Sequence, residues 1–85
     1  LIKPQFELEG NRETFSGVIT DTLLLFDILI SVYKSLAEEN VGVASIIDSP
    51  IKGRKGNREF LAMLVEGASL TLEEFEKELH NLLVL

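Results

Sequence analysis

An unusually apolar helical segment constrains the fold more than any other part of the chain. Asp21 is a suitable N-cap, and the helix that it predicts runs to about Asn40. The polar positions of this helix form one narrow stripe, which consists of Asp27, Ser31, Lys34, Ser35 and Glu38. Apolar side chains cover most of the remaining surface. A helix with so little polar surface is either buried on two sides or covers a sheet.

Strand-like segments on both sides of this helix favour the second arrangement. The predicted strands are Leu1–Phe6, Val41–Ile47 and Arg58–Glu66, with a loop over Glu7–Thr20. A capping box of Thr71 and Glu74 begins a second, amphipathic helix. A long helix between the first two strands implies a parallel crossover, whereas the short loop at 48–57 implies a hairpin. The sequence therefore predicts an α/β fold with a three-stranded mixed sheet and two helices.

This topology brings two charged residues to one edge of the predicted sheet. Lys3 lies near the end of the first strand and Glu59 at the start of the antiparallel third strand. Residues at the carboxyl ends of strands in an open sheet often line an active site. Taken singly, each residue is more often an ordinary solvent-exposed charge, and Glu59 next to Arg58 resembles a surface ion pair. The pair is a candidate active site because of its predicted position.

Length and composition exclude several kinds of protein. Eighty-five residues form one domain at most, and a hydrophobic content of 46% is typical of a globular chain. The chain has no cysteine and one histidine, His80, so we expect no disulfide, no thiol nucleophile and no metal site. The most apolar run, Leu23–Tyr33, is shorter than the ~20 residues that a membrane span needs. The lack of cysteine fits a cytoplasmic protein.

The charge is distributed unevenly along the sequence. A net charge of −6 argues against non-specific binding to nucleic acid over the whole surface. The segment Asp48–Arg58, however, holds four of the eight basic residues and a single acid. Its basic residues are Lys52, Arg54, Lys55 and Arg58. Such a loop is ordinarily a solvated hairpin, but beside an active-site rim it is also a candidate contact for an RNA backbone.

Two strings in the sequence resemble the C-terminal part of the TlyA/hemolysin A-type RNA methyltransferases, an FtsJ-like group. The chain reads LIKPQFE at residues 1–7, SGVITD at 16–21 and SPIKGRKGNREFL at 49–61. The family shows K-P-Q-F-E, a G-V-V-R-D-like run and S-P-I-x-G-x-x-G-N-x-E-F-L in the same order. The resemblance covers about residues 1–64, so residues 1–66 are interpreted as the C-terminal part of the methyltransferase domain. The amphipathic helix within 67–85 has no counterpart in the resemblance.

The resemblance implies a Rossmann-like domain that methylates a ribose 2′-hydroxyl of ribosomal RNA with S-adenosylmethionine. Lys3 would be the second lysine of a Lys-Asp-Lys-Glu tetrad and Glu59 its glutamate. A lysine can remove the hydroxyl proton only if its pKa falls well below about 10.4, and carboxylates orient such an amine. The family's other two tetrad residues and its cofactor loop lie upstream. We therefore expect this portion to be inactive alone, with the cofactor bound mainly by a missing upstream part.

Two further expectations concern other functions and partners. The segment at 8–16 differs from the glycine- and lysine-rich stretch of the family, so a non-catalytic RNA- or ribosome-binding module is the alternative. Membrane lysis, suggested by the haemolysin label alone, is a remote third function. In the family's strand order the strand at 58–65 lies between the other two. Leu1–Phe6 would then form an exposed edge, through which two copies could associate.

Overall fold

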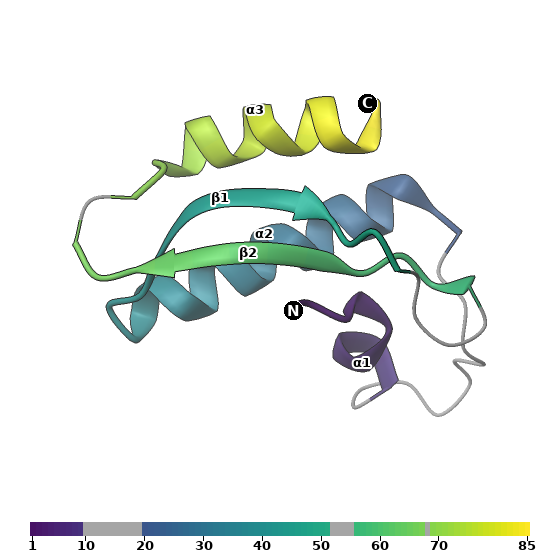
Figure 1. Cartoon of the computed structure of the whole chain (residues 1–85), viewed down its shortest axis with the longest axis horizontal. Helices are drawn as coiled ribbons and strands as arrows, with labels where there is room; N and C mark the ends of the chain where they lie inside the picture. The colour runs from purple at the N-terminus through teal and green to yellow at the C-terminus, as the bar shows by residue number, and fades with distance from the viewer. Residues whose placement is uncertain (10–19, 52–55, 68) are drawn as a thin grey trace.

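In the part of the chain that the structure describes, three helices pack with a two-stranded antiparallel ribbon (Figure 1). The computed structural model describes residues 1–9, 20–51, 56–67 and 69–85. The elements are α1 (Pro4–Glu9), α2 (Thr22–Glu38), β1 (Gly42–Asp48), β2 (Phe60–Val65) and α3 (Leu72–Leu83). The strands pair from Asp48↔Phe60 to Gly42↔Val65, with an irregularity in β1 between Val43 and Ser45. The predicted strands at 41–47 and 58–66 and both predicted helices are thus confirmed in type.

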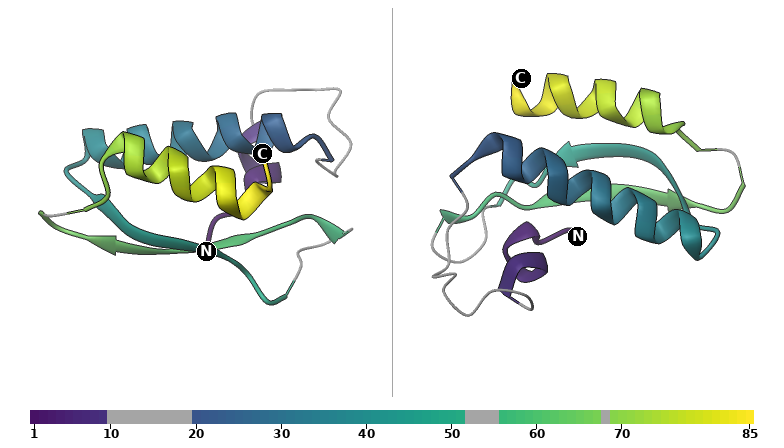
Figure 2. Two further views of the ribbon diagram at one scale, coloured as in Figure 1. Left: turned by 90° about the horizontal axis from the view of Figure 1, so that it is seen from above. Right: turned by 180° about the vertical axis from the view of Figure 1, so that it is seen from behind.

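Two layers make up the body of the protein. Helices α2 and α3 lie together on one face of the ribbon, as the view from above shows (Figure 2). The core between these layers consists of Leu25, Ile28, Leu29, Val43, Ile46, Phe60, Phe75, Leu79 and Leu83. The opposite face of the ribbon carries the exposed side chains of Ile47, Leu61 and Met63. Helix α2 therefore covers a sheet, one of the two arrangements that its apolar surface predicted.

Side-chain caps fix where the two long helices begin. The Asp21 carboxylate accepts a hydrogen bond from the backbone N–H of Leu23 at 2.9 Å. Thr71 and Glu74 form the predicted capping box, with bonds of 2.9 and 3.2 Å. The Tyr33 hydroxyl joins α2 to the segment that precedes α3, by donating to the carbonyl of Leu70 at 2.7 Å. Each capping side chain bonds to a group two or three residues away in the sequence. The sequence alone therefore predicted where both helices begin.

The predicted strand at Leu1–Phe6 is wrong. Ile2 alone pairs with Phe60, through hydrogen bonds of 2.6 and 2.9 Å, and the chain turns into α1 at Pro4. Proline suits the first position of a helix because its φ angle fits the first turn and it has no N–H to donate to a neighbouring strand. Within the described residues the sheet is consequently two-stranded and antiparallel instead of three-stranded and mixed, and there are three helices instead of two. The predicted loop also begins later, since Glu7 is helical and residues 10–19 lie outside the described residues.

The position of β2 between β1 and the N-terminal residues agrees with the expected strand order. Ile2 contacts the edge of β2 that faces away from β1, so β2 lies between β1 and the N-terminal residues. This placement brings the two strings of the sequence together, because Ile2 belongs to the first and Phe60 to the second. It also sets the position of the candidate site.

A glycine is required at position 42, at the start of β1, because the segment around Ser69 passes close to its backbone. A Cβ atom at this position would overlap the Ser69 side chain, which the bond from Leu70 N–H to the Val43 carbonyl (2.9 Å) holds in place. We expect Gly42→Ala to lower the free energy of unfolding by about 1–3 kcal/mol, as overpacking does. Urea unfolding of the double variant Gly42→Ala/Ser69→Gly should recover most of this loss. Additive effects of the two substitutions would contradict the steric explanation.

Candidate functional site

Lys3 lies between the Ile2–Phe60 pair and the first turn of α1. Its ammonium group is 5.3 Å from the centroid of the Phe6 ring, a cation–π distance. The side chain is half-buried and lines a cavity of about 360 Å³ between the edge of β2 and helix α2. We call this cavity the edge groove; its other described lining residues are Leu1, Ile2, Phe6, Glu7, Val32, Leu36, Ala62 and Leu64. Lys3 is thus the cationic group at the rim of a mainly apolar groove.

Glu59 lies just before β2 and is buried, with 8% of its surface exposed. Its carboxylate accepts a long hydrogen bond of 3.4 Å from the side-chain N–H of Gln5, which is itself only 4% exposed. Its backbone carbonyl accepts from Ser49 at 2.8 Å. Glu59 also lines a separate cavity of about 250 Å³, together with Asp48, Ser49 and Arg58. A buried carboxylate needs such partners because burial otherwise disfavours its charge.

The structure therefore brings the two strings into contact but does not join the two candidate catalytic residues directly. In the described part of the chain, no hydrogen bond or ion pair links Lys3 to Glu59, and they line different cavities. Gln5 contacts Glu59 instead, because the turn of α1 directs it toward the start of β2. Sequence reasoning missed Gln5. Pro4 was the available signal, since a helix starting there changes which residues of the string face inward.

Gln5 has an unsatisfied hydrogen-bonding group beside the buried carboxylate. Its side-chain oxygen is buried and has no hydrogen-bond partner within the described residues. Buried polar atoms are nearly always paired, so a lone acceptor marks a place where a donor would be favourable. The Gln5–Glu59 pair is accordingly a buried polar centre whose amide oxygen can still accept a hydrogen bond.

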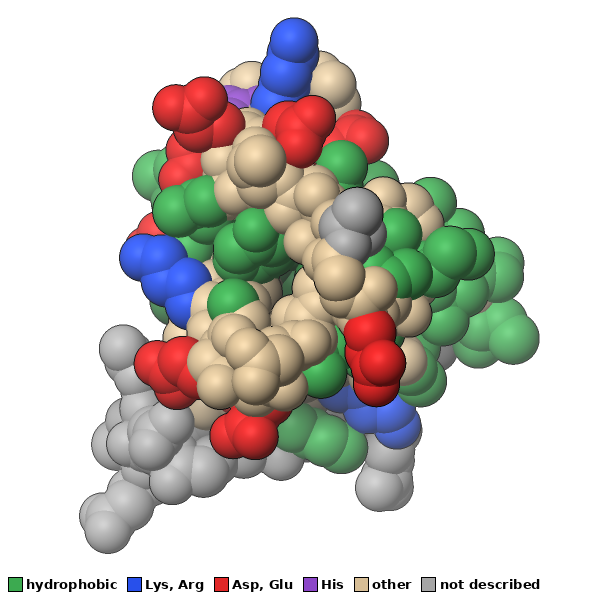
Figure 3. Space-filling view, turned by 90° about the vertical axis from the view of Figure 1, so that its left-hand side faces the viewer, with side chains coloured by type: hydrophobic (Ala, Val, Ile, Leu, Met, Phe, Trp, Pro, Cys, Tyr) green, Lys and Arg blue, Asp and Glu red, His purple; other side chains and the backbone are tan. Residues whose placement is uncertain are grey.

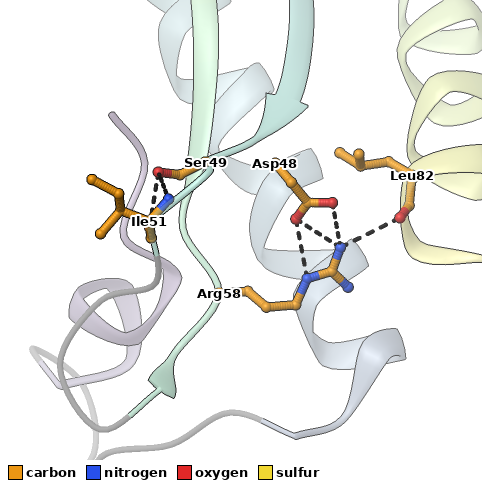
Figure 4. A network of polar contacts seen from close by, with 5 residues as sticks. All are labelled: Asp48, Ser49, Ile51, Arg58 and Leu82. Atoms are coloured by element: carbon orange, nitrogen blue, oxygen red, sulfur yellow. Dashed lines mark hydrogen bonds and ion pairs between the residues drawn. The ribbon is translucent and has the colours of Figure 1, made fainter.

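Arg58, which the sequence suggested as an RNA contact or a partner of Glu59, pairs with Asp48 in this structure, and its contact with RNA stays a prediction. Its guanidinium donates to both carboxylate oxygens of Asp48 at 2.8 Å and to the carbonyl of Leu82 at 3.4 Å (Figure 4). It also lies 5.3 Å from the Phe60 ring centroid. Arg58 therefore ties the end of β1 to helix α3. The three other residues predicted to contact RNA, Lys52, Arg54 and Lys55, lie outside the described residues.

The described surface shows how charged and apolar side chains are distributed. Seen from the end where β2 stops, acidic and basic side chains are scattered over the visible face, and hydrophobic side chains gather on its right-hand flank (Figure 3). Among the residues that the structure describes, no group of three potential metal ligands occurs. No helix in these same ranges is long and apolar enough to cross a membrane.

Comparison with known proteins shows a similarity to a curated protein. The chain is 38% identical over 65 residues to Hemolysin A of Brachyspira hyodysenteriae. The match covers 76% of this chain but 27% of that protein, so the chain spans about a quarter of its relative's length. No protein-family model matches the chain. The similarity supports a relationship to hemolysin A, in agreement with the resemblance of the two strings.

Proposed function

From this relationship to hemolysin A, we propose that the chain is the C-terminal part of a ribosomal RNA ribose 2′-O-methyltransferase that uses S-adenosylmethionine. The observation that carries the proposal is the contact between the two strings. Ile2 pairs with Phe60, and Gln5 donates to the buried Glu59. Gln5 and Glu59 are 54 positions apart in the sequence, so the fold has to bring them together. If the resemblance of the two short strings were due to chance, there would be no reason for them to be in contact.

The proposed chemistry assigns complementary roles to the two charged side chains. A ribose hydroxyl must lose its proton as it attacks a methyl group, so a base or a positioning group has to lie next to it. In this proposal Lys3 binds that hydroxyl from the rim of the edge groove. Glu59 orients the amine once RNA is bound, and Gln5 holds the carboxylate in place. Catalytic contacts often tighten only in the substrate complex, so the present separation of Lys3 and Glu59 is compatible with these roles.

The cofactor would be bound by residues outside this chain. S-adenosylmethionine would supply the methyl group, but the cavities of the described residues contain no glycine-rich turn at a helix N-terminus that could hold it. The two polar groups of the Gln5–Glu59 centre also do not form an adenosine site. We therefore derive no step through the cofactor. The part of the protein that we assign to this chain is the RNA-facing side of the reaction.

Transfer of a labelled methyl group tests the proposal. A protein of the relative's length that contains this chain is incubated with labelled S-adenosylmethionine and with each ribosomal subunit or its naked RNA. We expect label to enter ribosomal RNA. If a folded protein transfers no label to any of these substrates, the enzyme proposal is wrong.

A non-catalytic RNA-binding module is the second candidate, and one observation favours it. Lys3 and Glu59 line different cavities, as expected for a relative that kept the fold and lost the reaction. In this case RNA binding would persist in the absence of methyl transfer. The two candidates share the basic loop as a binding element and differ in whether label is transferred.

The basic loop makes a separate prediction about salt dependence. Replacement of Lys52, Arg54 and Lys55 by glutamine should reduce the slope of log K against log salt by about 2 to 3, because each phosphate contact contributes about 0.7–0.9. RNA binding measured over a salt series checks this result. The matched control replaces the helix residues Lys34 and Lys77, and should leave the slope nearly unchanged. An unaltered slope in the loop variant would show that these residues do not contact phosphate.

A further inference from the structure

The guanidinium of Arg58 connects the end of β1, the start of β2 and the end of α3. Its Nε and Nη2 atoms donate to the carboxylate of Asp48, the last residue of β1, at 2.8 to 3.2 Å. The Nη2 atom also donates to the carbonyl of Leu82 in the last turn of α3, at 3.4 Å (Figure 4). We call Asp48, Arg58 and the Leu82 carbonyl the clamp. The clamp holds two elements of the fold to the residue directly before Glu59.

The contact with α3 uses a backbone group that the helix itself leaves unpaired. The last four carbonyls of an α-helix have no partner within the helix, and Leu82 is the last residue but one of α3. A cation at this end also interacts favourably with the helix dipole. The last turn of α3 contains His80 but no lysine or arginine. Arg58 therefore supplies a positive charge that α3 lacks.

The clamp restricts geometry more than it adds stability. The side chains of Arg58 and Asp48 are 29% and 43% exposed, and exposed ion pairs contribute little to the free energy of unfolding. A contact of two guanidinium nitrogens with both oxygens of one carboxylate does, however, fix the orientation of the guanidinium plane. The centroid of the Phe60 ring lies 5.3 Å from the same guanidinium. Arg58 thus has an orientation that several contacts define together.

Glu59 lies between two residues whose positions are fixed. Arg58 comes before it, and the fully buried Phe60 comes after it. The backbone carbonyl of Glu59 accepts a hydrogen bond of 2.8 Å from the N–H of Ser49. Its carboxylate, by contrast, accepts a long bond of 3.4 Å from Gln5. The position of the carboxylate therefore depends strongly on the backbone, which the clamp holds on one side.

We propose that helix α3 positions Glu59 through the clamp. Asp48 and Arg58 are then positioning residues that act through Glu59, and a direct contact of Arg58 with RNA is the competing explanation. The effect on rate rests on the proposed methyltransferase function, whereas the coupling of α3 to the backbone around Glu59 does not. The inference gives a role to α3, for which the resemblance of the two strings has no counterpart.

Amide exchange in a protein of the relative's length tests the coupling without any reaction. Asp48→Asn and Arg58→Gln each remove one side of the clamp. Both should speed exchange of the Ser49 N–H, which bonds to Glu59, by about two- to fivefold, as expected for a partly exposed ion pair. Both should have the same effect on the Leu85 N–H, which bonds to the last turn of α3. Unchanged exchange at these two amides would overturn the proposal.

Methyl transfer by the same variants tests the effect on rate. Each should lower the single-turnover rate at saturating RNA and cofactor by about 10-fold or more, because a small misplacement can cost about 10²-fold. The double variant should lose no more than either single variant, since all of them remove one clamp. The salt dependence of RNA binding should not change. The matched control, Lys77→Gln, removes an exposed charge from α3 and should change neither rate nor exchange.

The outcomes separate this inference from the proposed function. An unmodified protein that transfers no label contradicts the proposed function, and faster exchange at Ser49 and Leu85 would still support the coupling. Normal rates in both variants of an active protein would overturn the positioning role. So would a loss of rate in Arg58→Gln alone with a salt slope lower by about 0.7–0.9, which would show that Arg58 contacts a phosphate instead.

Discussion

Phe60→Ala should unfold a large fraction of the protein. Phe60 is fully buried, with 0% of its surface exposed, and begins the strand that joins the N-terminal residues to the rest of the chain. Truncation of a buried phenylalanine costs about 3–5 kcal/mol. An 85-residue chain has a total stability of about 4–13 kcal/mol, at 0.05–0.15 kcal/mol per residue. Urea unfolding followed by circular dichroism should therefore show a midpoint that is strongly lowered or lost.

A matched substitution on the same strand separates the effect of losing a buried side chain from the effect of placing alanine in a strand. Met63 is 62% exposed on the open face of the ribbon. At low protein concentration, Met63→Ala should cost less than about 1 kcal/mol, as most surface substitutions do. Similar losses for the two variants would contradict the assignment of the core to the helix side of the ribbon.

Lys3→Ala in a protein of the relative's length should reduce methyl transfer by about 10²–10⁴-fold, the usual contribution of a proton-transferring group. The binding of S-adenosylmethionine should not change, because we assign the cofactor site to residues outside this chain. Single-turnover rates measured at saturating cofactor, together with the dissociation constant of the cofactor, check both parts of the prediction.

The control for this substitution removes a lysine that has no place in the proposed site. Lys34 is exposed on α2, and Lys34→Ala should leave the transfer rate close to that of the unmodified protein. Glu59→Gln keeps the side-chain volume and a hydrogen-bond acceptor for Gln5. A lower rate of methyl transfer in this variant would therefore show that the reaction needs the negative charge of Glu59. Normal transfer by Lys3→Ala would remove this residue from the reaction.

The parts of the fold that local chemistry determines could be predicted from the sequence. Asp21 caps α2, and Thr71 with Glu74 caps α3, through contacts within three residues of the helix start. The β-branched run before Asp48 and the glycine-containing loop after it predicted the hairpin of β1 and β2. In each case the interacting groups are close in sequence, so the pattern alone specifies the structure.

The N-terminal element could not be predicted in the same way. Leu1–Phe6 has the apolar content of a strand, and Pro4 is compatible both with a strand end and with a first helical turn. The choice depends on whether a neighbouring strand is present to pair with these residues. In this chain only Ile2 pairs with β2, at Phe60, and the residues from Pro4 onward form α1.

The candidate site was predicted in part. That the two strings come together follows from the resemblance, and the contact of Ile2 with Phe60 agrees with it. The partner of Glu59 was not predicted, because Gln5 reaches it only when the string is helical. The pairing of Arg58 with Asp48 was also missed. Arg58 is next to Glu59 in the sequence, so Glu59 was the carboxylate considered as its partner.

The chemical position of the transferred methyl group is the most direct test of the central claim. Ribosomal RNA is treated with S-adenosylmethionine and a protein of the relative's length, then digested, and its methylated nucleosides are identified by mass spectrometry. The account predicts a ribose 2′-O-methylated nucleoside that is absent after treatment with the Lys3→Ala variant. Methylation on a base, or an unmodified ribose after treatment with a folded protein, would contradict it.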